Sequence, residues 1–174
     1  MKRCLDHLER TLPILDKIYR KTLCLQNYLL NDGHCQGLAE ACQFLDHRVV
    51  NRMLFKNCGI SGENLSLILE GATKMKDFKA LIYKANSLNF EAVDRLAPLL
   101  QRKMPLHLEE LSLIDCKIGP TLTEHLMNVL LKKNHLRKVA LVKIMHNERS
   151  FESIIELVQK SGHLKELDLS WSSV

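Results

Sequence analysis

The sequence has few aromatic residues and no long apolar stretch. Phe, Trp and Tyr together make up 5% of the 174 residues, so a core has to be built mainly from Leu, Ile and Val. No run of 18 apolar residues occurs, which excludes an ordinary transmembrane helix. Hydrophobic residues nevertheless account for 46% of the chain. This length and composition predict one domain with a core of its own.

We do not expect a secretory leader at the start of this sequence. Met1–Arg3 has the basic start of a signal peptide, but charged and polar side chains interrupt the segment where an apolar region should follow. The interrupting residues are Asp6, His7, Glu9 and Arg10. We therefore expect a cytoplasmic protein, with the nucleus as the alternative location.

A strong excess of charge is absent as well. The chain has 25 Lys and Arg residues against 20 Asp and Glu residues, a net charge of +5, and the two signs are interleaved along the sequence. This pattern does not favour nucleic acid or a membrane surface as the partner. Lys132 and Lys133 either complement the C-terminus of a helix or contact an acidic or phosphate-bearing partner.

The motifs of common active sites are missing. The sequence contains no G-x-x-x-x-G-K-[ST], G-x-S-x-G, H-E-x-x-H or G-x-G-x-x-G. His34, Cys35, Cys42 and His47 form a His/Cys cluster, but the spacing C-x6-C-x4-H does not match a structural zinc site. We therefore predict that the protein is not an enzyme and uses no cofactor, metal or small-molecule substrate.

One apolar pattern recurs along most of the chain. It is clearest at Leu108, Leu111 and Leu113, which have the spacing of a short strand, followed by Leu122–Leu130 with the periodicity of a helix face. The pattern returns at intervals of 28 or 30 residues. The other copies are Val50/Met53/Phe55, Phe78/Leu81/Tyr83, Leu136/Val139/Leu141 and Leu164/Leu167/Leu169. Such a period predicts stacked strand–helix units that bury their apolar faces jointly.

The residues after each strand complete a recognisable signature. Cys58, Asn86 and Cys116 follow three of the triplets at the same distance, and an Ile or Leu comes two residues later. The pattern L-x-x-L-x-L-x-x-[NC]-x-[LI] resembles that of leucine-rich repeats, and the unit of about 28 residues resembles the ribonuclease-inhibitor-like class. The resemblance covers roughly Tyr19 to Val174. It implies an α/β fold: a right-handed leucine-rich-repeat solenoid with parallel strands on the concave face and helices on the convex face.

We predict a single leucine-rich-repeat domain over residues 1–174. Residues 1–19 carry an apolar helical stripe and form either an N-terminal cap or the helix of a preceding repeat. The repeats are predicted at 20–49, 50–77, 78–107, 108–135 and 136–163, with a partial terminal repeat at 164–174.

Several polar residues are predicted to support this architecture. Cys58 and Cys116 should point inward at the turn and remain reduced thiols, as in an intracellular protein. Ser61 should cap a helix. Thr121, with Glu124 three residues later, matches a capping box at the start of the helix predicted at Leu122–Leu130.

The C-terminal end is predicted to be open. A strand at 167–169 is followed by no helix in the sequence, and nothing downstream covers Trp171 and Val174. Terminal repeats usually carry a polar outer face. We therefore expect either a segment of a longer solenoid or a chain whose uncapped end associates with another molecule.

The concave face is the best candidate for a binding surface. Residues between the inward anchors should form rows across it, with an exposed apolar track, two flanking lysines and a tryptophan anchor. The predicted partner-binding residues are Leu54, Lys56, Ile82, Lys84, Ile114, Val142 and Trp171. The competing interpretation is that these are β-prone strand residues that bind nothing.

Two classes of function follow. The first is a non-enzymatic protein–protein interaction scaffold, part of a larger protein or complex, that binds an unidentified protein partner through the concave strand face. The second is a regulator of an enzyme, such as a GTPase-activating module. It would use an irregular turn at Lys143–Arg149, with His146, Asn147 and Arg149 exposed.

Overall fold

The computed structural model describes residues 17–103, 108–132 and 135–173. These residues form one seven-stranded sheet whose strands follow one another in chain order. The strands are β1 (Ile18–Tyr19), β2 (Thr22–Gln26), β3 (Arg52–Lys56), β4 (Ala80–Lys84), β5 (Glu110–Ile114), β6 (Lys138–Val142) and β7 (Glu166–Asp168). The helices are α2 (Asp32–Ala41), α3 (Gly62–Ala72), α4 (Phe90–Leu100), α5 (Pro120–Leu130) and α6 (Glu148–Lys160), and a 3-10 turn, η2 (Cys42–Phe44), follows α2.

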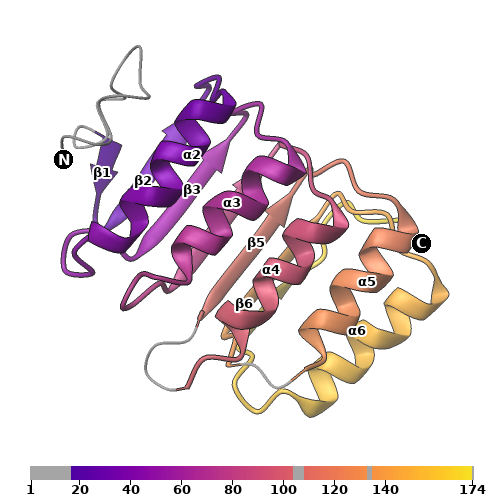
Figure 1. Ribbon diagram of the computed structural model, residues 1–174. Coiled ribbons are helices and arrows are strands. Elements are labelled where there is room, and N and C mark those ends of the chain that lie inside the picture. Colours follow the sequence, from indigo (N-terminus) through magenta and orange to yellow (C-terminus); the bar gives the residue numbers. More distant parts are fainter. Residues whose placement is uncertain (1–16, 104–107, 133–134, 174) are drawn as a thin grey trace.

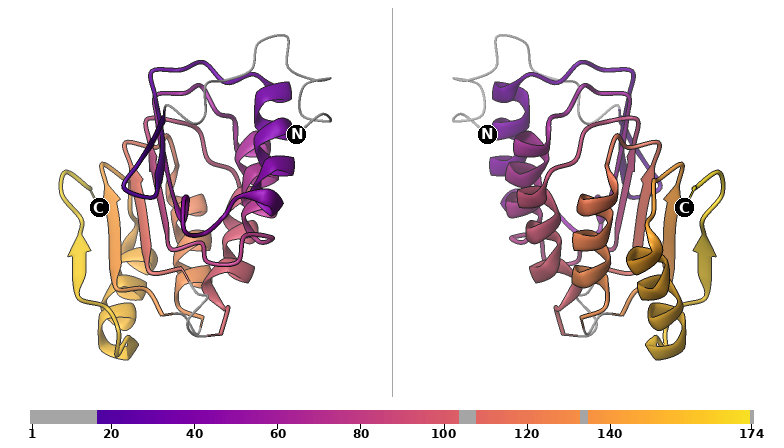
Figure 2. Two further views of the ribbon diagram at one scale, coloured as in Figure 1. Left: turned by 90° about the vertical axis from the view of Figure 1, so that its left-hand side faces the viewer. Right: turned by 90° about the vertical axis from the view of Figure 1, so that its right-hand side faces the viewer.

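The described helices cover one face of the sheet, and none of them lies on the other face (Figures 1 and 2). The two side views show the same two layers, strands on one side and helices on the other (Figure 2). β1 and α2 lie at one end of the molecule, and α6 and β7 lie at the opposite end (Figures 1 and 2). None of the helices in the described part is long and apolar enough to cross a membrane.

Strands β2 to β7 are parallel and keep one register throughout. Leu54 of β3 pairs with Cys24 of β2 and with Ile82 of β4, and Ser112 of β5 continues the row. Residues 28 or 30 positions apart in the sequence therefore lie side by side, as the apolar period predicts. The α/β arrangement with a mostly parallel sheet is confirmed.

The core lies between the sheet and the helix layer. Alternate strand residues point into it because successive side chains leave a strand on opposite faces, and Leu111 and Leu113 are fully buried. Tyr83 is also fully buried, and its hydroxyl donates to the carbonyl oxygen of Ile60 at 3.1 Å or of Ser87 at 2.7 Å. Its hydrogen-bonding group is therefore satisfied inside an otherwise apolar core.

The predicted inward side chains form hydrogen bonds at the turns after β3 and β4. Asn86 Oδ1 accepts the backbone N–H groups of Cys58 at 2.9 Å and Ile60 at 3.2 Å, and its Nδ2 donates to Lys84 O at 2.8 Å. The Cys58 thiol lies 3.2 Å from Leu25 O and can donate to it. The described cysteines are unpaired thiols, and the inward position predicted for Cys58 is confirmed.

The residue after each of strands β2 to β6, and Trp171 at the equivalent repeat position beyond β7, adopt a left-handed backbone conformation, with φ between 51° and 60°. The row consists of Asn27, Asn57, Ala85, Asp115, Lys143 and Trp171. Asn and Asp adopt this conformation readily, but Ala, Lys and Trp do not. The repeat spacing aligns these residues in a row, but it did not predict their left-handed conformation, because three of them are of types that do not indicate it.

One local prediction is confirmed, one is wrong, and one falls mostly outside the described residues. Ser61 caps α3 as predicted, accepting the N–H of Asn64 at 3.2 Å. Thr121 does not cap a helix, because α5 begins at Pro120 with Gly119 as its N-cap. Proline suits the first helical position, where its missing N–H costs nothing. In the stretch predicted as a cap or helix, residues 1–16 lie outside the described residues, and Ile18 and Tyr19 form β1, antiparallel to β2.

Candidate functional site

The uncovered face of the sheet carries three rows of outward side chains. The first row forms ion pairs across the strands: Arg52 with Glu110, and Lys138 with Glu166 at 3.0 Å. The hydrogen bond that Lys138 donates to Glu166, aided by the charge of Glu110, raises the pKa of Lys138. The Arg52–Glu110 pair spans the intervening strand at Ala80, which is completely buried. Cations in this row are therefore matched by acids of the same sheet.

The second row is mainly apolar at its centre. Leu54 and Ile82 are register partners in β3 and β4, and both are half-buried. Ser112 and Ala140 continue the row in β5 and β6 and are buried. Asp168 ends the row at β7 and is exposed. The apolar surface available for contact is therefore concentrated on β3 and β4.

The third row combines two lysines with two apolar residues. Lys56 and Lys84 are register partners, and Ile114 and Val142 follow in β5 and β6. All four are half-buried. Neither lysine forms an ion pair with any of the residues that the structure describes. Two adjacent, unmatched ammonium groups thus lie beside the apolar pair of the second row.

The left-handed turn row forms the rim of this face. Asn57 Nδ2 donates to Asn27 Oδ1 at 3.1 Å, and Lys143 Nζ lies 3.6 Å from Asp115 Oδ2. Trp171 ends the row and is 86% exposed. Polar contacts therefore join two neighbouring pairs of the rim, and an exposed indole lies at its C-terminal end.

The structure brings six of the seven predicted binding residues together on this face. Leu54 and Ile82 occupy one row, while Lys56, Lys84, Ile114 and Val142 occupy the next; Trp171 lies apart, on the rim. The sequence analysis expected the apolar members to be exposed, but the structure shows that they are half-buried. Neighbouring strands are only ~4.8 Å apart, so their side chains cover one another.

The turn at Lys143–Arg149 is not irregular. Lys143 takes the same left-handed conformation as its counterparts, and Asn147 caps α6 by accepting the N–H of Ser150 at 2.8 Å. His146 was expected to be exposed but is only 6% exposed. Arg149 is exposed, and its Nη1 lies 3.6 Å from Glu124 Oε1. The geometry of the turn therefore gives no support to a role as an enzyme regulator.

His146 is an unusual core residue. It occupies the position that Ile118 occupies one unit earlier, and burial lowers its pKa. Its Nδ1 lies 3.4 Å from Ser150 Oγ, while no described residue offers a hydrogen-bond partner to its Nε2. A buried imidazole with an unsatisfied nitrogen costs free energy.

The His/Cys cluster does not assemble into a metal site. His34 Nδ1 accepts the backbone N–H of Asn31 in a capping box at the start of α2. Burial raises the pKa of Cys35 and of Cys42 to about 12, so both thiols stay protonated near neutral pH. Within residues 17–103, 108–132 and 135–173, no group of three or more His, Cys, Asp or Glu side chains could hold a metal ion.

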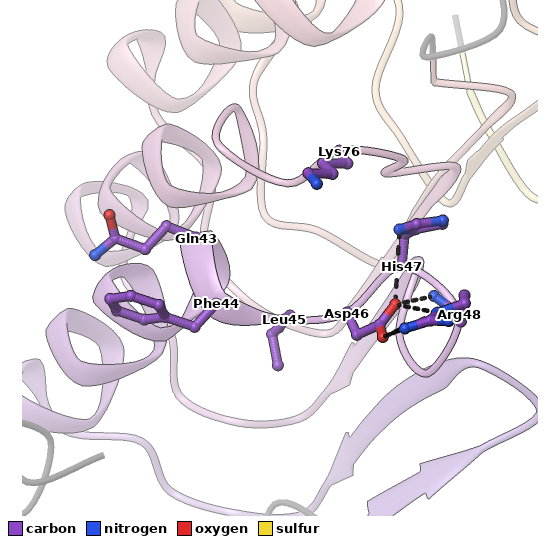
Figure 3. A pocket seen from close by; sticks show the side chains of 7 residues that line it. All are labelled: Gln43, Phe44, Leu45, Asp46, His47, Arg48 and Lys76. Carbon is purple, nitrogen blue, oxygen red and sulfur yellow. Dashed lines mark hydrogen bonds and ion pairs between the residues drawn. The ribbon is translucent and has the colours of Figure 1, made fainter.

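A shallow hollow of about 400 Å³ lies beside η2 (Figure 3). Asp46 lies on its wall and accepts a hydrogen bond from Arg48 Nη2 at 2.7 Å, and its Oδ1 lies 3.6 Å from His47 Nδ1. The hydrogen bonds from Arg48 lower the pKa of Asp46 to about 2. The carboxylate is thus engaged within its own loop. The hollow is lined by Gln43, Phe44, Leu45, Asp46, His47, Arg48 and Lys76, a set without a Ser, Cys or Thr nucleophile.

Sequence reasoning also passed over an apolar stripe on α6. Phe151, Ile155 and Val158 are exposed, although the same helix buries Ile154 and Leu157 against the sheet. The spacing of Phe151, Ile154, Ile155 and Val158 is typical of a helix. It could not show that two separate faces of the helix are apolar and that only one of them is covered.

Comparison with known proteins reveals similarity at the level of the fold. The sequence matches no protein-family model and no curated protein. The structure resembles leiomodin-1 actin-binding site 2, with a TM-score of 0.64 and 16% identity over 84% of each chain. It also resembles the C-terminal domain of tropomodulin from Caenorhabditis elegans, with a TM-score of 0.62 and 15% identity over 91% of each chain. The fold is thus leucine-rich-repeat-like.

Proposed function

We propose that this protein is a non-enzymatic interaction module that binds a protein partner through the uncovered face of its sheet. The observation that carries the proposal is the contrast between rows on that face. Elsewhere on it, Arg52, Lys138 and Lys143 each have an acidic partner, whereas Lys56 and Lys84 have none among the described residues. The two lysines lie beside the half-buried Leu54 and Ile82.

This arrangement favours a partner of defined chemistry. Two like charges on directly opposed strand positions repel each other. An acidic group from a partner that bridges Lys56 and Lys84 would remove that repulsion, and an apolar side chain beside it would cover Leu54 and Ile82. Ile114 and Val142 extend the apolar contact along the next two strands. A partner segment with a carboxylate next to an aliphatic or aromatic residue fits this surface best.

The same proposal includes the shape of the face. Neighbouring strands lie ~4.8 Å apart, whereas packed helices lie ~8–10 Å apart. Each repeat contributes one strand and one helix, so the helix layer must be longer than the sheet along the stacking direction. The molecule therefore curves, with the sheet on its concave side. Connections between parallel strands through a helix are right-handed in about 98% of cases. We thus assign a right-handed solenoid of the ribonuclease-inhibitor-like class to the single domain and repeats outlined above.

Trp171 is included in the binding surface as an anchor at its C-terminal edge. Tryptophan is enriched among the residues that contribute most to protein interfaces, and this indole is almost fully exposed. The proposed site is thus Leu54, Lys56, Ile82, Lys84, Ile114, Val142 and Trp171, in a cytoplasmic or nuclear protein that serves within a larger protein or complex.

Actin is the first partner to test, because one structural neighbour is an actin-binding site of leiomodin-1. Cosedimentation with actin filaments and fluorescence titration of actin monomers would be compared for the wild type and for Leu54→Glu/Ile82→Glu/Ile114→Glu. We expect the triple variant to stay folded by circular dichroism and to lose binding. Leu67→Glu, on the helix layer, is the matched control and should bind normally.

If neither form of actin binds, quantitative pull-downs from cell extract would apply the same comparison to other partners. The proposed binding face would be supported if the wild type and Leu67→Glu capture a set of proteins that the triple variant does not capture. The same capture profile for all three proteins would refute it.

A further inference from the structure

The segments that lead from each helix into the next strand lie at one edge of the molecule. Strands β2 to β7 are parallel and paired position for position, so their N-terminal ends are level. The segments are 45–51, 73–79, 101–103, 108–109, 131–132, 135–137 and 161–165 in the described part of the chain, and the β1–β2 turn at 20–21 joins them. We call this set the basic edge. It runs along the stack of units, so a further unit would lengthen it and would not cover it.

The acidic residues in the described part of the basic edge are already paired with cations of the same edge. They are Asp46, Asp77 and Glu109. Arg48 Nη2 lies 2.7 Å from Asp46 Oδ2. Lys79 Nζ lies 3.2 Å from Asp77 Oδ1 and 3.0 Å from Glu109 Oε1. These carboxylates are therefore not available to balance the other cations of the edge.

Six further cations of the basic edge are exposed and form no ion pair with any residue that the structure describes. Stabilisation of helix C-termini does not account for them, because that effect is limited to the last turn. None of the described helices α2 to α5 has a basic residue in its last turn. The six cations are Arg20, Lys21, Lys74, Lys76, Lys103 and Lys165.

The opposite edge has a different charge. It consists of the segments that lead from each strand into the next helix, and in 27–31, 57–61 and 85–89 these contain no Lys, Arg, Asp or Glu. The last two segments add Lys117 and Lys143 against Asp115, and the first turns of α2, α3, α4 and α6 each carry an acid. Charges that alternate along the sequence are thus separated by the fold, because every unit places the same connection at the same edge.

The basic edge also exposes apolar side chains near its N-terminal end. Tyr19, Phe44 and Val49 are 65%, 79% and 48% exposed. Phe44 and Lys76 line the same hollow beside η2 (Figure 3), and the guanidinium of Arg20 lies 5.1 Å from the centre of the Tyr19 ring. Aromatic side chains next to cations suit the boundary between lipid headgroups and acyl chains. The edge thus combines groups that attract anionic headgroups with groups that insert shallowly between them.

We propose that the basic edge binds the surface of a bilayer that contains anionic lipids, with Tyr19, Phe44 and Val49 inserted at headgroup depth. Because the strand ends are level, a flat surface contacts the segments of the edge together. Duplex DNA suits this edge less well, since proteins read it by placing a helix or a β-ribbon in a groove. The described helices and strands instead end where the basic edge begins. The uncovered face of the sheet stays free, so this binding does not depend on the function proposed above.

Cosedimentation of the 174-residue chain with lipid vesicles tests the proposal. We expect binding to vesicles of phosphatidylcholine with roughly 30 mol% phosphatidylserine, weak binding to phosphatidylcholine alone, and a loss of binding as salt is added. Each cation near the surface contributes roughly fivefold in affinity, so Lys74→Glu/Lys76→Glu should weaken binding by at least roughly thirtyfold.

Lys117→Glu/Lys143→Glu is the matched control, because it changes the net charge equally at the opposite edge. It should bind the anionic vesicles like the wild type, and circular dichroism should show both double variants folded. Equal losses for the two double variants, or a wild type that does not distinguish the two kinds of vesicle, overturns the proposal.

Tryptophan fluorescence tests which side chains insert. Trp171 is the single tryptophan of the sequence, so Phe44→Trp in a Trp171→Phe background reports on position 44 alone. We expect its emission to shift to shorter wavelength with the anionic vesicles and to stay unchanged with phosphatidylcholine. Unchanged emission on vesicles that carry the bound chain overturns the insertion of Phe44. A chain that binds a DNA duplex but not the anionic vesicles overturns the proposal in favour of nucleic acid.

Discussion

Leu111 and Leu113 in β5 are fully buried, whereas Leu167 and Leu169, at the same positions 56 residues later, remain partly exposed. β5 pairs with its neighbours over five residues on both sides, and β7 pairs with β6 over three. The repeat pattern is the same at both places. The contrast shows that burial depends on having a covered neighbour on each side, as expected where each unit contacts only the units beside it.

The largest expected effect is a difference between two leucine truncations. Leu113→Ala should lower the free energy of unfolding by ~2–5 kcal/mol, because it leaves a cavity in a packed core. Leu169→Ala should cost less than ~1.5 kcal/mol, since its side chain is already partly in water. Urea unfolding followed by circular dichroism gives both values. Equal losses would show that the C-terminal end is as well packed as the middle.

The turn side chains offer a second comparison. Asn86→Ala removes the acceptor for the N–H groups of Cys58 and Ile60 and should cost ~3 kcal/mol, because buried backbone donors lose their partners. Ser172→Ala, at the equivalent place in the last unit, removes a hydrogen bond to Leu141 O and should cost ~1 kcal/mol. Hydrogen exchange of the Cys58 amide reports the first loss directly. Unchanged protection there would contradict the assigned role of Asn86.

His146 makes the C-terminal end sensitive to pH. Burial holds its pKa below the usual value of 6.5, so the folded state binds the proton less well than the unfolded state. Its contribution to stability is present above pH 6.5 and is lost as the pH falls through the unfolded value towards the lower folded one. The free energy of unfolding should therefore decrease below pH 6.5.

His146→Ile restores the residue type found at Ile118 and removes the proton linkage. We expect a gain of ~1 kcal/mol at neutral pH, from removal of the unsatisfied nitrogen, and a larger gain at pH 5. His163→Ile is the control for an exposed histidine and should leave the pH dependence of the wild type in place. Parallel pH profiles for the wild type and His146→Ile would contradict a buried neutral imidazole.

The smallest expected effect concerns the left-handed turns. Ala85→Gly should raise the free energy of unfolding by ~0.5–1 kcal/mol, because glycine adopts a φ of 52° without strain. Trp171→Gly relieves a similar strain, but it should change global stability by less than ~0.5 kcal/mol, since the terminal unit contributes little to the cooperative core. Thermal melts of the two variants provide the measurement. A larger gain in stability for Trp171→Gly than for Ala85→Gly would contradict the prediction that the C-terminal unit contributes less to stability than the middle of the molecule.

Much of the fold could be predicted from the spacing of its apolar residues. The triplet beginning at Leu108 located β5, and its copies located β3, β4 and β6, because a register repeated every 28 or 30 residues leaves little freedom in how strands pair. The inward role of Cys58 followed from its place in the pattern. Ser61 was identified as a cap because a Ser just before an apolar helical run has few other roles.

The errors arose where residue type and position disagreed. Thr121 and Glu124 match a capping box, but Pro120 starts the helix one residue earlier. His146 was judged by its polarity, although its place 28 residues after Ile118 assigned it to the core. Position in the repeat was the better guide in both cases, because the neighbouring unit determines which side chains are enclosed.

The candidate site could be predicted only in part. Its rows followed from the register, and the matched positions of Lys56 and Lys84 could be read from the sequence. Lys138 and Lys143 have acidic neighbours, whereas these two lysines do not. This difference depends on side-chain conformations, which cannot be predicted from residue spacing. The exposed stripe on α6 was hidden for a related reason, since Phe151 looks the same in a sequence whether or not another helix covers it.

The unbroken register of β2 to β7 has an evolutionary consequence. Because β3, β4 and β5 pair position for position, with no bulge or slip, the removal of one whole unit would bring matching edges together and leave a shorter but intact sheet. Duplication of a coding segment of that length would lengthen the sheet in the same way. Recombination can thus change the width of the binding surface in steps of one strand, while each remaining residue keeps its place in its row.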